Sequence, residues 1–213
     1  MALNHASIFY HKIKRPCSGY RIMEEIGCKG NEFRAKGNVA GGRRMPVLSS
    51  IARRLKKFYF LDGVSKDEVV LEIGCGDGWV GRHLAGRGVR QLTSIDTNPP
   101  ATIVGDIRDW RSLGLGAQTF DVIVAFEVLE HVDCMDDCFS LLKPGGRLLV
   151  TSPNPSADWF LKKLEEWKLN QPRTSPHDHL MYFEETAQFQ ITRVWRPLRM
   201  SQWCIFRRMP AED

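Results

Sequence analysis

The stretch Val69-Val-Leu-Glu-Ile-Gly-Cys-Gly-Asp-Gly78 decides the fold of this chain of 213 residues. Its first half is an apolar, β-branched run with one acid, Glu72, and predicts a buried strand over residues 68–73. Three glycines at alternate positions follow, and glycine allows positive φ and a close approach of the backbone to a ligand. A helix is predicted from Trp79 to Ala85. A strand, a glycine turn and a helix in this order form a cradle for a nucleotide-like ligand. The G-x-G-x-G spacing differs from the G-x-G-x-x-G of dinucleotide sites.

Strands and helices alternate on both sides of this turn. Apolar runs predict further strands at 91–95, 101–104, 120–126, 147–151, 189–195 and 202–207, and helices at 109–115, 128–142 and 157–169. Repeated β-α-β units imply helices on both faces of a mostly parallel sheet. The sequence therefore predicts an α/β fold, Rossmann-like and doubly wound, with about seven strands and an antiparallel pair at its C-terminal edge.

One connection departs from this pattern. Only nine residues, two of them proline, separate Asp96 from Asp106. This is too short for a helix between the second and third strands. A tight connection is expected instead, and it would leave that face of the sheet open.

The charge is divided unevenly along the chain. Residues 1–57 contain 13 Lys and Arg but 3 Glu, a net charge of +10, whereas the remainder has a net charge of −5. We expect residues 1–60 to form a basic N-terminal segment with a cap helix, and residues 61–213 to form the main domain. Such a segment suits an anionic partner, either RNA, a phosphorylated substrate or a membrane surface. A solvated arm without a partner is the alternative.

The cap helix is predicted over residues 47–60. Val47, Ile51, Leu55 and Phe58 fall on one face, and basic residues occupy the rest. We expect this apolar face to pack on the domain, with a membrane surface as the alternative.

Other features exclude some classes of protein. No apolar run is long enough to cross a bilayer, and the N-terminus lacks the apolar core of a secretory signal. The six cysteines form no paired C-x-x-C motif, so a structural zinc site is not expected. A cytoplasmic location is predicted.

Two acids follow the ends of predicted strands, where ligands bind in open α/β sheets. Asp96 follows the glycine turn by about twenty residues, the position from which an acid binds ribose hydroxyls. Asp106 can accept a hydrogen bond from an adenine amino group, with Ile107 packing on the ring. Together with the glycine turn, these acids indicate a nucleoside-containing cofactor.

The glycine turn resembles motif I of class I S-adenosylmethionine (SAM) methyltransferases, and Phe120-Asp-Val-Ile-Val-Ala-Phe-Glu-Val-Leu-Glu-His-Val132 resembles motif IV. Leu141-Leu-Lys-Pro-Gly-Gly-Arg-Leu-Leu-Val150 resembles the following strand of that family. The chain resembles the broad ubiquinone/menaquinone-type group of this family. The resemblance implies SAM as the cofactor, bound by Glu72, Gly74, Cys75, Gly76, Asp77, Asp96, Thr97, Asp106, Ile107, Phe126 and Glu127.

The resemblance also implies transfer of a methyl group to a small-molecule or lipid-like acceptor, most readily at oxygen. An RNA 2′-O-methyltransferase and a non-catalytic SAM-binding or partner-binding protein are the alternatives. A general base helps when the acceptor is a hydroxyl, and His131, His177 and His179 are the candidates.

A divalent cation is a further alternative. Glu127, Glu130 and His131 have the i, i+3, i+4 spacing of one helix face, and His177 or His179 would complete the ligands of an Mg²⁺ ion. This element resembles the E-x-x-E-H of ubiquinone-biosynthesis O-methyltransferases and small-RNA 2′-O-methyltransferases. Because magnesium prefers oxygen ligands, a site without metal stands beside this hypothesis.

Overall fold

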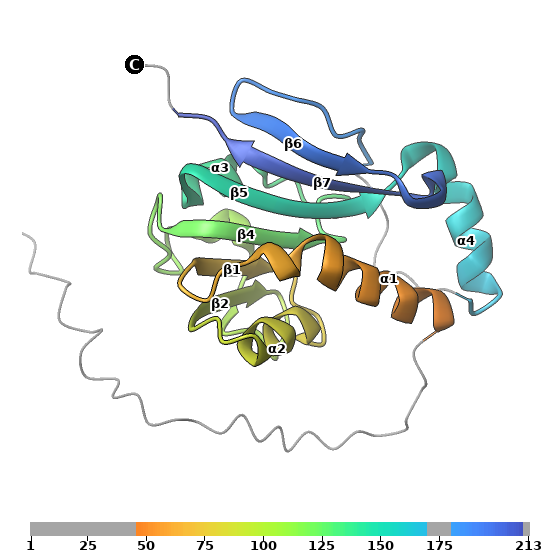
Figure 1. Cartoon of the computed structure of the whole chain (residues 1–213), viewed down its shortest axis with the longest axis horizontal. Helices are drawn as coiled ribbons and strands as arrows, with labels where there is room; N and C mark the ends of the chain where they lie inside the picture. Colours follow the sequence, from red (N-terminus) through yellow and green to blue (C-terminus); the bar gives the residue numbers. More distant parts are fainter. Residues whose placement is uncertain (1–45, 170–179, 211–213) are drawn as a thin grey trace, which may run out of the picture. The chain divides into compact units, whose positions relative to one another are not determined.

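The structure, a computed structural model, describes residues 46–169 and 180–210, which belong to a compact unit spanning 44–213. A seven-stranded sheet in the order β3-β2-β1-β4-β5-β7-β6 forms its centre (Figure 1). The strands are β1 (Val69–Ile73), β2 (Gln91–Asp96), β3 (Ile103–Val104), β4 (Phe120–Phe126), β5 (Leu142–Pro153), β6 (Phe189–Trp195) and β7 (Ser201–Arg208). The α-helices are α1 (Val47–Tyr59), α2 (Trp79–Gly86), α3 (Met135–Leu141) and α4 (Asp158–Glu166). Short 3₁₀ turns are η2 (Leu61–Gly63), η3 (Ile107–Asp109), η4 (Pro155–Ala157) and η5 (Pro197–Arg199).

The sheet confirms the predicted fold class. β1 pairs in parallel with β2 and β4, and the parallel pairing continues to β3 and β5 at either side. β7 runs antiparallel to both β5 and β6, so the last two strands form the antiparallel pair at the edge. The carboxyl ends of β1, β2 and β4 therefore lie side by side at one end of the sheet.

Alternate residues of the central strands enter two apolar cores, one on each face. Val70 and Val124 lie in the core under α2 and η2, whereas Leu71 and Ile123 lie in the core that contains α3. All four side chains are at most 1% exposed. This period of two is the pattern of strands covered on both faces.

The predicted tight connection between β2 and β3 is confirmed, because residues 97–102 contain no helix. The hydroxyls of Ser94 and Thr102 lie 3.1 Å apart, and the Thr102 backbone N–H donates to Ser94 Oγ. These contacts join the two ends of the connection without a helix. Because this connection contains no helix that could cover β2, most of the strand is only partly buried.

The prediction of a helix over residues 128–142 is wrong in its first half. The Glu127 backbone N–H donates to the Thr151 carbonyl oxygen, so the chain stays beside β5 for one residue beyond β4. Glu127 then takes a positive φ of 57°, and a turn closes with a bond from His131 N–H to the Val128 carbonyl oxygen. α3 begins only at Met135. Similarly, η3 and turns replace the helix predicted at 109–115.

The orientation predicted for α1 is also wrong. Val47, Ile51 and Phe58 are 70%, 51% and 74% exposed, whereas the buried residues of this helix are Ser49 and Lys56. The predicted packing of the apolar face on the domain is therefore reversed. Within the described residues, no helix has both the length and the apolar character needed to cross a bilayer.

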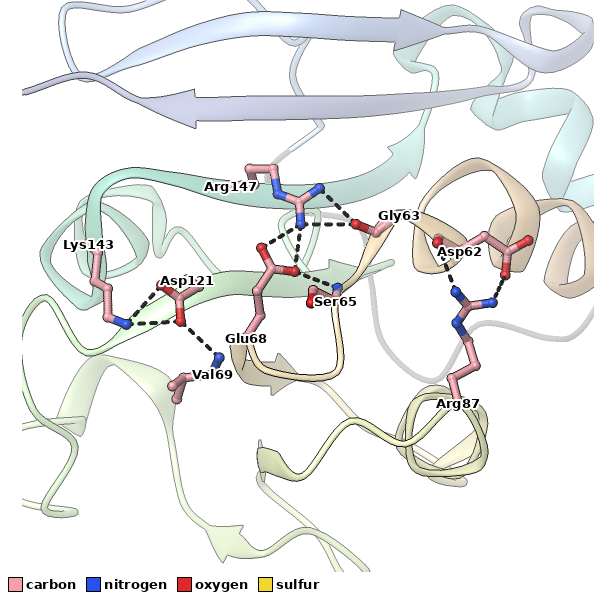
Figure 2. A network of polar contacts seen from close by, with 9 residues as sticks. All are labelled: Asp62, Gly63, Ser65, Glu68, Val69, Arg87, Asp121, Lys143 and Arg147. Carbon is pink, nitrogen blue, oxygen red and sulfur yellow. Dashed lines mark hydrogen bonds and ion pairs between the residues drawn. The ribbon is translucent and has the colours of Figure 1, made fainter.

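Charged contacts join the opposite, amino ends of the central strands (Figure 2). The Arg147 guanidinium binds both carboxyl oxygens of Glu68, at 2.8 and 2.9 Å, and donates to the Gly63 carbonyl oxygen. Asp121 accepts from the Val69 backbone N–H and from Lys143 Nζ. The two clusters tie β1, β4 and β5 at the end of the sheet away from the glycine turn.

We expect Arg147→Leu to lower the free energy of unfolding by about 2 kcal/mol, because it leaves a partly buried carboxylate without its charged partner. The matched control is Arg90→Leu, because Arg90 pairs with Asp67 where both side chains are more than half exposed. That change should cost at most about 0.5 kcal/mol. Urea unfolding at neutral pH measures both, and equal effects would contradict a structural role for the Arg147 cluster.

Candidate active site

The glycine turn lies at the carboxyl end of β1 and has the backbone that its sequence predicts. Gly74, Gly76 and Gly78 have φ of 71°, 51° and 72°, values that side chains disfavour. A Cβ on Gly74 would lie 2.5 Å from Val128 Cγ2, whereas one on Gly76 would meet nothing within 4 Å. Gly74 is thus needed for packing, and the surface above Gly76 is open to a ligand.

Glu72 is buried beneath this turn, with 3% of its surface exposed. Burial raises its pKa to about 7, although a hydrogen bond from the Gly81 backbone N–H works in the opposite direction. A Cβ on Gly81 would lie 3.3 Å from Glu72 Oε2, so the absence of a side chain there makes room for the acid. Cys75 is also buried, and desolvation raises the pKa of its thiol.

Asp96 connects the glycine turn to the end of β2. One carboxyl oxygen accepts from the Gly76 backbone N–H at 3.0 Å, and the other accepts from Asn98 N–H at 3.0 Å. Thr97 lies beside it and is exposed. The predicted ribose-binding acid and the predicted cradle are therefore in direct contact.

The two adenine candidates lie at the next strand end. Asp106 accepts three hydrogen bonds from Arg108. The bonding to the Arg108 side chain is the main reason why the pKa of Asp106 is lowered. Ile107 is 4% exposed and packs in the core that contains α3. Asp106 thus has its own arginine partner, and Ile107 supports the turn from below.

At the end of β4, Glu127 is the centre of a charged cluster. Its Oε1 accepts from Lys56 Nζ at 2.6 Å and from Thr151 Oγ1 at 2.8 Å. Burial opposes ionisation of Glu127, but the adjacent ammonium and these hydrogen bonds hold its pKa below the usual value. With 42% of the side chain accessible, the charge of Lys56 and these hydrogen bonds together outweigh the cost of burial.

Glu130 has the opposite charge state. It is 1% exposed, and burial, followed by the nearby charge of Glu127, raises its pKa to about 9. Burial and the charge of Glu127 favour the protonated form of Glu130, whereas Lys56 favours the ionised form of Glu127, so the pair holds its proton on Glu130. Glu130 Oε2 makes no hydrogen bond within the described residues.

The described residues of the predicted cation site differ from the expected arrangement. Glu127, Glu130 and His131 lie on a turn rather than on one helix face, and the ammonium of Lys56 already neutralises Glu127. Across residues 46–169 and 180–210, no group of three or more acids, histidines or cysteines is arranged to hold a metal ion. His177 and His179 lie outside the described residues, and His131 is partly buried in the turn after β4.

Two residues of the candidate site that were not predicted from the sequence belong to α1. Arg53 pairs with Asp77 at 2.7 Å and lies over the Trp79 ring, and Lys56 pairs with Glu127. Ser49, Arg53 and Lys56 have helical spacing on the face opposite the apolar stripe, and this spacing was the available signal. What the spacing did not show is which face turns inward.

Aromatic rings surround the cluster. The Phe126 ring stacks on Trp79 at 6.0 Å and contacts Phe60 at 5.0 Å, and Lys56 Nζ lies 5.3 Å from its centre. Tyr59 packs against Trp203. By contrast, Phe58, Trp159 and Trp167 are 74%, 63% and 62% exposed.

A glycine turn hydrogen-bonded to an acid on the next strand, in a 3-2-1-4-5-7-6 sheet with β7 reversed, defines the class I methyltransferase fold. A family profile described as a methyltransferase domain matches residues 43–189. The chain belongs to this family, the SAM-dependent methyltransferases of the type 11 group.

Proteins of similar sequence or structure are also methyltransferases. The ubiquinone biosynthesis O-methyltransferase of Coxiella burnetii is 29% identical over 65% of this chain and 62% of its own length. That of Xylella fastidiosa is 34% identical over 43% of this chain and 44% of its own. The chain thus spans about three fifths of the length of the first curated relative. The N-methyltransferase NodS of Bradyrhizobium japonicum, solved with S-adenosyl-L-homocysteine, has the same fold, with TM-score 0.51, 20% identity and coverage of 78% and 89%.

The raised pKa of Glu130 predicts a pH-dependent stability. The folded state holds this proton more tightly than the unfolded chain, whose pKa is about 4.5, so the stabilisation is complete below that pH. It is lost as pH rises towards about 9. We expect the free energy of unfolding to fall over this window by on the order of 1 kcal/mol per pH unit at most.

Glu130→Gln should remove the part of the slope above about pH 7, because a neutral amide cannot lose the proton, while the contribution of Glu72 below about pH 7 stays. Glu72→Gln is the matched control. Its slope of unfolding free energy against pH should differ from that of the unchanged protein only below about pH 7, because the pKa of Glu72 is about 7. Urea unfolding at several pH values between 5 and 9 measures both. An unchanged slope in Glu130→Gln would show that Glu130 is ionised in the folded protein.

Proposed function

We propose that this protein transfers a methyl group from SAM to an oxygen atom of a small-molecule or lipid-like acceptor. The observation that carries the proposal is the glycine turn at the end of β1, whose Gly76 N–H is bound by Asp96 at the end of β2. A nucleoside with a charged tail is held by this arrangement, in which a glycine turn with positive φ lies beside an acid at the end of the neighbouring strand.

The proposed cofactor site extends along the carboxyl ends of β1, β2 and β4. The glycine turn, with Cys75, Asp77 and the buried Glu72, would hold the methionine end. Asp96 and Thr97 would bind the ribose hydroxyls. Asp106 would share its hydrogen-bonding capacity between Arg108 and the adenine amino group, with Ile107 beneath.

When bound, SAM supplies an electrophilic methyl group on a sulfonium. Transfer is an in-line displacement, and much of its acceleration comes from holding the acceptor in a near-attack position. Phe126 and Trp79 provide a stacked aromatic wall beside Glu127. We propose that this wall excludes water and that Glu127 lies next to the reacting carbon.

Two observations support an oxygen acceptor. The curated relatives named above are ubiquinone biosynthesis O-methyltransferases. In addition, Glu127 is kept ionised by Lys56, so it can accept a hydrogen bond from a hydroxyl and orient the oxygen. A carboxylate with a lowered pKa is a weak base, and His131 therefore remains the proposed proton acceptor among the described residues.

Gly76→Ala tests the cofactor site. Its positive φ should cost about 1–2 kcal/mol of stability, and the added methyl group would occupy the space of the cofactor. We expect SAM affinity, measured by isothermal titration, to fall by roughly tenfold or more. Gly88→Ala is the matched control, because Gly88 has φ of 88°, is equally open and lies at the end of α2. Equal affinities in the two variants would contradict the site.

A transfer assay with methyl-labelled SAM and a cell extract tests the acceptor. We expect label in the lipid or small-molecule fraction, and we expect Glu127→Gln to lower the rate at saturating SAM by roughly tenfold to a hundredfold. Label in RNA would favour the RNA methyltransferase. A protein that binds SAM but labels no fraction would favour a non-catalytic role.

A further inference from the structure

Helix α1 presents its apolar side to solvent. Val47, Ile51, Leu55 and Phe58 are 70%, 51%, 39% and 74% exposed, and they follow one another along one side of the helix. We call these four residues the outer stripe. Single exposed apolar residues are ordinary, but a continuous stripe along a helix indicates a contact surface.

The opposite side of α1 is held in place by charge. Lys56 is 8% exposed and pairs with Glu127, while Arg53 pairs with Asp77 and lies over Trp79. Rotating the helix to bury the outer stripe would break both ion pairs and leave Lys56 or Glu127 without its partner. The exposure of the outer stripe is therefore fixed by the site itself.

The charge of α1 limits what can cover the outer stripe. The helix contains four basic residues and no acid, and Arg54 is exposed between Ile51 and Leu55. A second copy of the chain would bring the same positive charge against it. The N-terminal residues 1–45 are also strongly basic in sequence. An anionic partner is favoured over either of these occupants.

Apolar side chains interspersed with arginine favour a lipid surface over RNA. Val, Ile, Leu and Phe side chains can enter the boundary between headgroups and acyl chains, whereas RNA is bound through phosphate contacts and stacking on planar groups. α1 has the pattern of a helix that lies in the plane of a membrane surface.

We propose that the outer stripe docks α1 onto the surface of a bilayer that contains anionic lipid. The opposite side of the same helix contacts Glu127, so docking would bring the candidate active site close to the membrane. A lipid-like acceptor would then reach the site from the bilayer. That consequence rests on the proposed function, whereas docking itself does not require methyl transfer.

The test is flotation of the full chain with vesicles, either of phosphatidylcholine alone or of phosphatidylcholine mixed with phosphatidylglycerol. The protein should float with the mixed vesicles, more weakly with the neutral ones, and less at high salt. The double variant Ile51→Ser, Phe58→Ser should reduce binding by roughly tenfold or more, because two apolar side chains no longer enter the lipid. Arg54→Glu should reduce binding to the mixed vesicles only.

The matched control is Val104→Ser on β3, which removes an apolar side chain of similar exposure, 53%, from outside the outer stripe. It should float like the unchanged protein. Circular dichroism and thermal unfolding verify that each variant is folded, and isothermal titration with SAM is run on the same samples. If the unchanged protein binds SAM but does not float, docking alone is overturned. If the unchanged protein floats but does not bind SAM, only the proposed function is overturned.

Several outcomes would overturn docking. One is failure of the unchanged protein to float with anionic vesicles, and another is equal flotation of the double variant. A concentration-dependent dimer in analytical ultracentrifugation that the double variant abolishes would assign the outer stripe to a second copy. Salt-sensitive binding of RNA that requires the outer stripe, without flotation, would assign it to nucleic acid.

Discussion

The ion pair between Lys56 on α1 and Glu127 at the end of β4 is the contact on which the site depends. The pair is 2.6 Å long and Lys56 is buried, so removing the charge of Glu127 would leave a buried ammonium without its partner. The pair keeps Glu127 ionised, and the charge of Glu127 together with burial keeps Glu130 protonated. The same contact fixes the rotation of α1, so the electrostatics of the site and the exposure of the outer stripe have one cause.

The rest of the site follows from sheet topology. Parallel strands in the order β2-β1-β4 bring their carboxyl ends together, so loops far apart in the chain meet at one edge. Asp96 reaches Gly76 across one strand spacing, and Glu127 reaches Thr151 across another. The missing helix between β2 and β3 does not disturb this edge, because the hydrogen bonds of Ser94 and Thr102 close the connection.

Local sequence predicted the strands well because their apolar runs and the glycine turn leave few alternatives. It failed where a tertiary contact competes with helical periodicity. The segment after β4 has helical spacing, yet Glu127 is held beside β5 by its bond to Thr151, and the chain turns before α3 begins. The three predicted metal ligands are therefore on a turn, and the charge that meets Glu127 comes from a helix 71 residues earlier.

The sequence by itself determined the class of this protein. The positive φ that glycine permits, the acids at strand ends and the period of two in the strands are local properties, and they suffice to indicate the fold and the cofactor. Only the tertiary structure decided which face of α1 turns inward. Periodicity shows that a helix has two unlike faces, but it does not show that Asp77 and Glu127 at the sheet edge pair with Arg53 and Lys56 and so turn the basic face inward.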